Sequence, residues 1–119
     1  MFLPSDHTFV VCAYKENPYI SETIQSLKSQ SVKSEIILST STPSAYLDGV
    51  CVDYDIKMVV NPNPRLAGDD WNYGYNAANS KLVTIAHQDD IYEPTYLETM
   101  LQTVNRFPEN ETLLAFSDY

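Results

Sequence analysis

Short runs of apolar residues alternate along the chain with stretches in which apolar residues recur every three or four positions. The runs are rich in β-branched residues and show no alternation of apolar and polar positions, which predicts strands that are buried on both faces. The predicted strands cover residues 8–13, 35–39, 56–60, 82–86 and 113–116.

The stretches between these runs predict three helices. One begins at Asn17-Pro18, with Asn as the cap and Pro in the first turn, and runs to about Gln30. A second covers residues 70–79, and a third begins at Pro94, where the apolar positions recur at helical spacing. Strands that alternate with helices predict an α/β fold of Rossmann-like type, with a mostly parallel sheet and helices on both faces.

Composition limits the classes of protein to which the chain can belong. Its 119 residues, 44% hydrophobic and 19% charged, fit a single globular domain over residues 1–119. The net charge of -9 disfavours nucleic acid as a partner, because phosphate binding needs a basic face. No apolar run approaches the length of a membrane span. The chain has two cysteines and no apparent signal peptide. This predicts a location in the reducing cytoplasm, either free or at the inner face of the membrane.

The loops after the predicted strands are where a ligand site is expected. Parallel sheets bind ligands at the carboxyl ends of their strands, which here are followed by residues 14–17, 40–44, 61–70 and 87–93. In the last of these loops, His87 and Gln88 precede the adjacent carboxylates Asp89 and Asp90. Adjacent carboxylates favour a hard divalent cation such as Mg²⁺ or Mn²⁺. His87 would then be a further ligand, a group that supports the ligands, or a contact to phosphate. The alternative is a solvated acidic loop before the next helix.

Other residues offer weaker chemistry. Arg65 lies in a strand-end loop, where it would hold a phosphate through two hydrogen bonds or form a surface ion pair. The ring of Tyr14 follows the first strand and would stack on a base. Asp69-Asp70 is predicted to cap a helix, and His7 is predicted to lie at the surface. The sequence contains no glycine-rich phosphate loop, paired-cysteine zinc motif or serine-nucleophile motif.

The order of these segments resembles that of family 2 glycosyltransferases with the GT-A fold. The resemblance runs from about Thr8 to Tyr119 and is carried by TFVVCAYKENPYISETIQSL, EIILSTSTPS and LAGDDWNYGYNAANSKLVTIAHQDDIYEPTYLETML. The last segment is similar to the part of that family in which an Asn-x-Gly helix leads into the strand that carries a DxD-type motif. The arrangement of Asn72-Tyr73-Gly74, Asp89-Asp90 and Pro94 is its most specific part.

The resemblance implies that the chain binds a nucleotide-diphosphate sugar, with a UDP-sugar expected first, for transfer to a glycan or polysaccharide acceptor. It implies Mn²⁺ or Mg²⁺ as the cofactor, held by Asp89 and Asp90, with His87 as a further candidate. Residues expected at the nucleotide sugar are matched to the family by position or taken from the strand-end loops: Ala13, Tyr14, Glu16, Thr40, Ser41, Arg65, Asn72 and Asp89.

The sequence departs from the family pattern in three places. Thr40 and Ser41 replace a common acidic pair, which leaves the identity of the base open. His87 stands where the family often carries the first Asp of its motif. The family's catalytic base lies in a later half, so we expect it beyond Tyr119, with the fold truncated after about the fifth strand and this chain alone inactive.

Two other classes of protein remain as alternatives. A non-catalytic nucleotide-binding or oligomerisation domain would keep the fold and form homo-oligomers through an exposed sheet edge. A receiver-type signalling domain has a similar length and the same alternation of strands and helices. It needs an acidic cluster after the first strand, whereas Ala13, Tyr14 and Lys15 follow here.

Overall fold

In the computed structural model, the four strands that lie within the described residues form one parallel sheet. They are β1 (His7–Ala13), β2 (Glu35–Thr40), β3 (Lys57–Val60) and β4 (Leu82–His87), in the order β3-β2-β1-β4. The structure describes residues 2–62 and 68–106, so the strand predicted at 113–116 lies outside the described residues. Among the described strands, the α/β fold and its parallel sheet confirm the prediction from the sequence.

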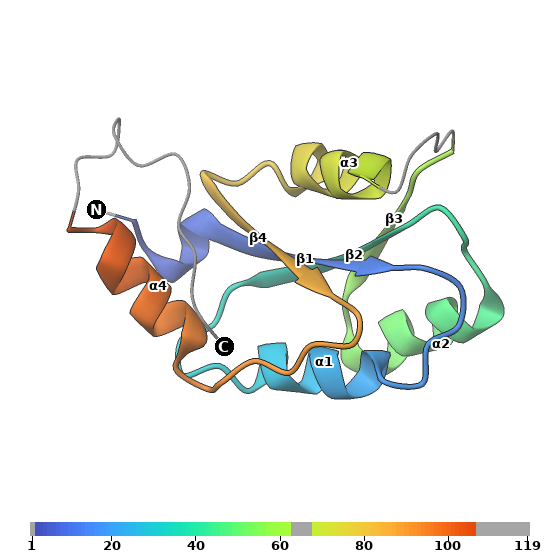
Figure 1. The fold of residues 1–119 in the computed structure, drawn as a ribbon, viewed down its shortest axis with the longest axis horizontal. Coiled ribbons are helices and arrows are strands. Elements are labelled where there is room, and N and C mark those ends of the chain that lie inside the picture. The colour runs from blue at the N-terminus through green and yellow to red at the C-terminus, as the bar shows by residue number, and fades with distance from the viewer. Residues whose placement is uncertain (1, 63–67, 107–119) are drawn as a thin grey trace.

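Helices cover both faces of the sheet (Figure 1). The helix α3 (Gly68–Ala78) lies on one face, while α1 (Ile20–Lys28) and α2 (Ala45–Tyr54) lie on the other with α4 (Tyr96–Val104). A short 3₁₀ helix, η1 (Pro4–Asp6), precedes β1. The chain therefore forms three layers, with helices on either side of a central sheet.

The helix α2 was not predicted from the sequence. Its buried residues Leu47, Val50 and Cys51 do have helical spacing, but Gly49 and the exposed Val52 obscure the pattern. Ser44 is the signal that marks its start, because the Ser44 side chain accepts a hydrogen bond from the N–H of Leu47 at 3.2 Å.

Two predicted helices begin later than expected, and each has a turn before it. The side chain of Asn17 accepts a hydrogen bond from the N–H of Tyr19 at 2.8 Å, so Asn17 and Pro18 form a turn and α1 starts at Ile20. The helix α4 starts at Tyr96, two residues after Pro94, because the N–H of Tyr96 donates to the carbonyl of Glu93 in a turn.

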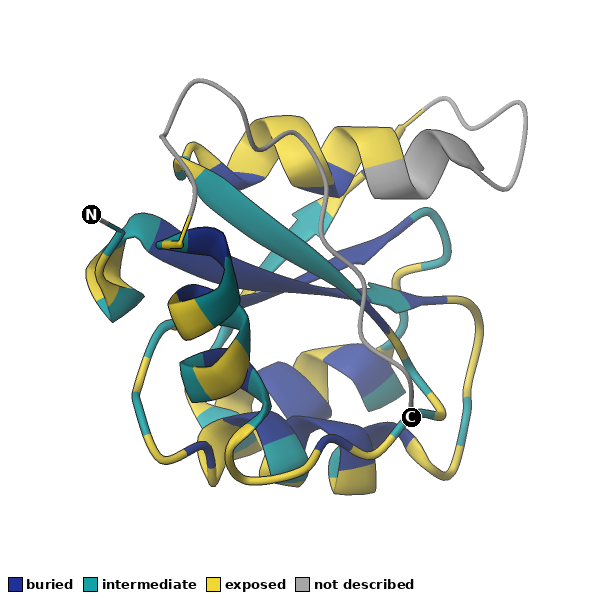
Figure 2. Cartoon of the chain, turned by 60° about the vertical axis from the view of Figure 1, so that its left-hand side comes forward, coloured by how far each residue is buried: buried dark blue, intermediate teal, exposed yellow. Residues whose placement is uncertain are grey.

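The hydrophobic core is divided unequally by the sheet. The larger part lies between the sheet and α1, α2 and α4, and its fully buried residues include Phe9, Leu38 and Leu97. The smaller part lies under α3 and contains Val10 and Ile37. Figure 2 shows that the two central strands, β1 and β2, are largely buried, whereas β4 is mostly half-buried. The prediction that every strand is buried on both faces is therefore wrong for β3 and β4, the outer strands of the described sheet.

Close packing at Gly74 places α3 on the sheet. A Cβ atom at Gly74 would lie 2.4 Å from Cγ1 of Val10 in β1 and 3.0 Å from Cβ of Ser39 in β2. Only a residue without a side chain allows this helix to approach the two central strands so closely. This is the glycine of the Asn-x-Gly motif found in the sequence.

The prediction that His7 lies at the surface is wrong. His7 is 4% exposed, and its imidazole lies between two hydroxyls, with Nδ1 3.0 Å from Oγ of Ser34 and Nε2 2.7 Å from Oγ1 of Thr84. Burial lowers the pKa of His7 to about 4, because the charged imidazolium is poorly solvated there. His7 is therefore a neutral, hydrogen-bonded core residue at the amino end of the sheet.

Candidate functional site at the carboxyl edge of the sheet

Three of the candidate loops lie together because their strands are neighbours. In the register of the sheet, Ala13 of β1 is opposite Thr40 of β2, and Cys12 of β1 is opposite His87 of β4. The loops that follow these strands therefore leave the same edge of the sheet (Figure 1). Asn61, which follows β3, joins them because its N–H donates to the carbonyl of Thr40 at 2.8 Å.

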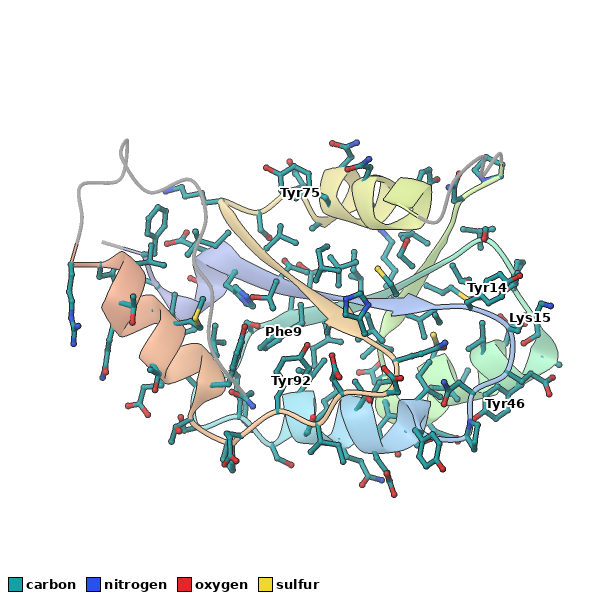
Figure 3. The ribbon with its side chains drawn as sticks, in the orientation of Figure 1. Phe9, Tyr14, Lys15, Tyr46, Tyr75 and Tyr92 are labelled. Atoms are coloured by element: carbon teal, nitrogen blue, oxygen red, sulfur yellow. The ribbon has the colours of Figure 1, made fainter. Side chains whose placement is uncertain are left out.

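The loop after β1 presents an exposed aromatic ring and two charges. Tyr14 is 57% exposed, and Lys15 and Glu16 beside it are also exposed. Lys15 has a positive φ of 57°, and its N–H donates to Oγ1 of Thr42 at 2.6 Å, so the loop turns toward the end of β2. The Lys15 ammonium lies 5.2 Å from the centre of the Tyr14 ring. Figure 3 shows both side chains at this edge.

The two hydroxyl residues at the end of β2, Thr40 within the strand and Ser41 after it, lie in different environments. Thr40 is fully buried, and its hydroxyl accepts a hydrogen bond from the N–H of Thr42 at 3.0 Å and lies 3.2 Å from the Thr42 hydroxyl. Ser41 is half-buried. The Thr40 hydroxyl therefore shapes the loop, while Ser41 is the more accessible of the two.

The loop after β4 carries the predicted metal ligands. The N–H of Asp90 donates to the carbonyl of His87 at 3.2 Å, which turns the chain directly after the strand. His87 and Asp89 are exposed, and Asp90 is half-buried. Within residues 2–62 and 68–106, no three His, Cys, Asp or Glu side chains converge on one point. Exposed carboxylates at a strand end still suit an ion that takes its other ligands from a bound diphosphate.

A polar stripe, formed by Thr23 and Ser26 on α1 and by Gln30 two residues beyond its end, binds the backbone of this loop. The Thr23 hydroxyl donates to the carbonyl of Gln88 at 3.0 Å, and the Ser26 hydroxyl accepts from the N–H of Tyr92 at 3.0 Å. The Gln30 amide donates to the carbonyl of Glu93 at 2.7 Å and accepts from the N–H of Leu97 at 2.9 Å.

The polar stripe was not identified from the sequence. Thr23 is fully buried and Gln30 is 1% exposed, so both are polar residues inside a hydrophobic core. The spacing of three and four residues between Thr23, Ser26 and Gln30 is the signal that marks them, because buried polar residues need partners. The ring of Tyr92, 6.2 Å from that of Phe9, anchors the same loop in the core (Figure 3).

The Gln88 side chain joins the loops after β1 and β4. Its Oε1 accepts a hydrogen bond from the N–H of Tyr14 at 3.1 Å, and its Nε2 donates to the carbonyl of Tyr14 at 3.4 Å. The loops at this edge are thus joined by hydrogen bonds from side chains to backbone groups. The side chains of Tyr14 and Asp89 remain exposed.

Of the remaining predicted site residues, Asn72 lies on α3 and Ala13 lies at the end of β1. Asn72 is exposed on this helix, which begins at the carboxyl edge of the sheet (Figure 1). Arg65 lies outside the described residues. Ala13, by contrast, is buried at the end of β1, so its contribution to a site is its position in the backbone.

Comparison with known proteins defines the class. The three-layer α/β fold with its parallel sheet is GT-A-like, since solved structures superpose on it. The glycosyl transferase family 2 model matches residues 8–112, and the chain belongs to this family. None of the curated proteins matches the chain.

Solved structures support the same fold. The crystal structure of S. aureus TarS superposes with a TM-score of 0.71 at 18% identity, covering 84% of this chain and 19% of that one. TarS 1-349 gives 0.74 at 17% identity, covering 84% and 32%. The mannosyltransferase PcManGT from Pyrobaculum calidifontis, in complex with GDP-Man and Mn²⁺, gives 0.72 at 17% identity, covering 83% and 32%. The chain therefore spans about a third or less of these proteins.

In the described part of the chain, none of the helices has the length and apolar character needed to cross a bilayer.

Proposed function

We propose that this chain is the donor-binding portion of a glycosyltransferase that binds a nucleotide-diphosphate sugar with a divalent metal ion. The observation that carries the proposal is the meeting of the loops after β1, β2 and β4 at one edge, with Tyr14 and Asp89 exposed there. Membership of glycosyl transferase family 2 supports the class of reaction.

Each part of the donor has a candidate partner at this edge. The exposed ring of Tyr14 stacks on the base, and Ser41 and Glu16 offer hydrogen-bond acceptors to the base or ribose. The backbone at Ala13 and Thr40 forms the floor beneath the nucleoside. Asn72 on α3 is a candidate for the diphosphate sugar, and Arg65, which lies outside the described residues, is a second.

Asp89 and Asp90, with His87 as a further candidate, are the residues that would hold Mn²⁺ or Mg²⁺. A bound metal ion would neutralise the negative charge that develops on the departing diphosphate. Only one or two protein ligands are needed when phosphate oxygens complete the coordination, which agrees with a loop that exposes its carboxylates.

The identity of the base depends on the residues at the end of β2. Thr40 and Ser41 contain no carboxylate, so the end of β2 offers the base only neutral hydrogen bonds. We propose a UDP-sugar as the first donor to test and a GDP-sugar as the second, because the similar mannosyltransferase was solved with GDP-Man. The acceptor that we propose for the complete enzyme is a glycan or polysaccharide.

Calorimetric titration of UDP, GDP and their sugars, each with and without Mn²⁺, tests the proposal. We expect binding that depends on the metal and that falls at least tenfold in Asp89→Asn, since a lost charged ligand costs more than about 1.4 kcal/mol. Glu93→Gln, an exposed carboxylate of the same loop, is the matched control. A folded protein that binds none of these nucleotides at millimolar concentration contradicts the proposed function.

A further inference from the structure

Beyond the last backbone pair of β1 and β4, the side chain of Gln88 makes hydrogen bonds of the kind that a backbone peptide group would make. The register of these strands ends at Cys12 opposite His87. Gln88 is one residue beyond His87, and Tyr14 is two residues beyond Cys12. The Gln88 carboxamide bonds both the N–H and the carbonyl of Tyr14, at 3.1 and 3.4 Å. A carboxamide can do this because it carries one acceptor and two donors in a plane, like a peptide group.

Gln88 is itself held from the other side. Its backbone carbonyl accepts a hydrogen bond from the buried hydroxyl of Thr23 in α1, at 3.0 Å. The residue is thus fixed between α1 and the loop after β1. Because Gln88 directly precedes Asp89 and bonds to Tyr14, it sets the position of one exposed group relative to the other.

We propose that Gln88 is a positioning residue that holds the nucleoside loop after β1 and the metal loop after β4 at the spacing of a single nucleoside diphosphate. This inference rests on the proposed function. A ligand that spans two subsites gains affinity when their separation is fixed in advance, whereas a ligand of either subsite alone does not. Loss of the Gln88 carboxamide therefore weakens the spanning ligand selectively.

Binding of three probes to Gln88→Ala tests this selectivity. The probes are UDP with Mn²⁺, uridine alone, and Mn²⁺ alone, followed by calorimetry, by ligand-observed NMR and by electron paramagnetic resonance respectively. We expect UDP affinity in the presence of Mn²⁺ to fall about tenfold, a usual size for coupling between sites. The affinities for uridine and for Mn²⁺ should stay within about twofold of the wild type, as for sites with no direct contact. Gln102→Ala, which removes an exposed glutamine from α4, is the matched control.

A second measurement needs no ligand. Amide hydrogen exchange at Tyr14 should be faster in Gln88→Ala, because its N–H loses its acceptor. In Gln88→Glu the acceptor is retained and the donor is lost, so the Tyr14 amide should stay protected while UDP affinity still falls. This second variant keeps the test valid if the alanine variant folds poorly.

The outcomes separate this inference from the function on which it rests. UDP affinity that is unchanged in Gln88→Ala, or uridine affinity that falls as much as UDP affinity, overturns the positioning role and leaves the proposed function in place. Unchanged exchange at Tyr14 also overturns it. A wild-type protein that binds no UDP with Mn²⁺ overturns both.

Discussion

The two ends of the sheet use polar side chains in opposite ways. At the amino end, the His7 imidazole and the hydroxyls of Ser34 and Thr84 bond to one another, and His7 is buried. At the carboxyl end, the side chains of Thr42 and Gln88 bond to backbone groups of the neighbouring loop. The first arrangement provides hydrogen-bond partners for buried side chains. The second fixes the position of the loop backbone and leaves other side chains exposed to solvent.

This difference separates stability from binding. Polar groups that satisfy one another in the interior contribute to the free energy of unfolding, because breaking one pair leaves a buried group without its partner. Exposed groups such as Tyr14 and Asp89 contribute little to stability and remain available to a ligand. Changes at the amino end should therefore alter unfolding alone, and changes at the carboxyl end should alter binding first. The predictions below are ordered by their expected effect on the free energy of unfolding.

The largest effect is expected from acid, acting through His7. Its pKa is lowered from 6.5 to about 4 by burial, so the unfolded chain takes up a proton between these values while the folded chain does not. Stability is then complete above about pH 6.5 and falls by about 3 kcal/mol as the pH drops to 4. Urea unfolding of the wild type and of His7→Gln across this range measures it. Because carboxyl groups titrate in the same range in both proteins, parallel stability curves would contradict the assignment.

Gly74→Ala tests the close packing of α3 against the two central strands, which extend to both ends of the sheet. The added Cβ would lie 2.4 Å from Val10 and 3.0 Å from Ser39, so α3 has to move away from the two central strands. We expect a loss of about 2 kcal/mol in the free energy of unfolding, as for other overpacked cores. Gly49→Ala in α2 is the matched control, because nothing lies within 4 Å of its added Cβ. That variant should gain up to about 1 kcal/mol from helix propensity. Equal effects of the two alanines would refute the close packing at Gly74.

A smaller effect on stability is expected from Thr23→Val, because Thr23 belongs to the core and also bonds the loop that carries Asp89. This substitution keeps the shape of the buried side chain but removes the donor to the Gln88 carbonyl. We expect a cost of about 1 kcal/mol in unfolding, together with weaker binding of UDP with Mn²⁺. Thr99→Val, on the exposed side of α4, should change neither quantity. Thr23→Val that lowers stability and leaves nucleotide affinity intact would show that α1 supports the fold but not the site.

The smallest effect on stability is expected from Tyr14→Ala. The ring is 57% exposed, so the free energy of unfolding should change by less than about 0.5 kcal/mol. Loss of base stacking should nevertheless weaken UDP binding by about tenfold, within the usual range for such contacts. Tyr75→Ala, on the outer face of α3 and 60% exposed, is the control for removing an exposed tyrosine (Figure 3). If both variants bind UDP like the wild type, Tyr14 has no part in the nucleoside site.

Sequence patterns predicted the elements whose signals are local. Continuous apolar runs located β1 to β4, and helical spacing located α1, α3 and α4. The strand-end rule directed attention to the loop segments that the structure brings together at one edge. Ser44 was a local signal for α2 that the apolar pattern obscured.

Relations between distant residues could not be predicted in this way. The hydroxyl partners of His7 lie 27 and 77 residues away in the sequence, and Tyr14 lies 74 residues from Gln88. A lone histidine before a strand and a glutamine after one carry no sign of these partners. Which polar residues are structural and which remain available to a ligand depends on the packing of the whole sheet.

The polar stripe along and just beyond α1 also constrains how the loop after β4 can vary. Thr23, Ser26 and Gln30 bind main-chain groups at Gln88, Tyr92, Glu93 and Leu97, and backbone groups are the same whatever the side chain. Side chains such as those of Asp89 and Ile91 can therefore be exchanged without loss of these bonds. Insertion or deletion of a single residue, in contrast, would move the later groups out of reach. Loop length, more than loop composition, is the property that the polar stripe fixes.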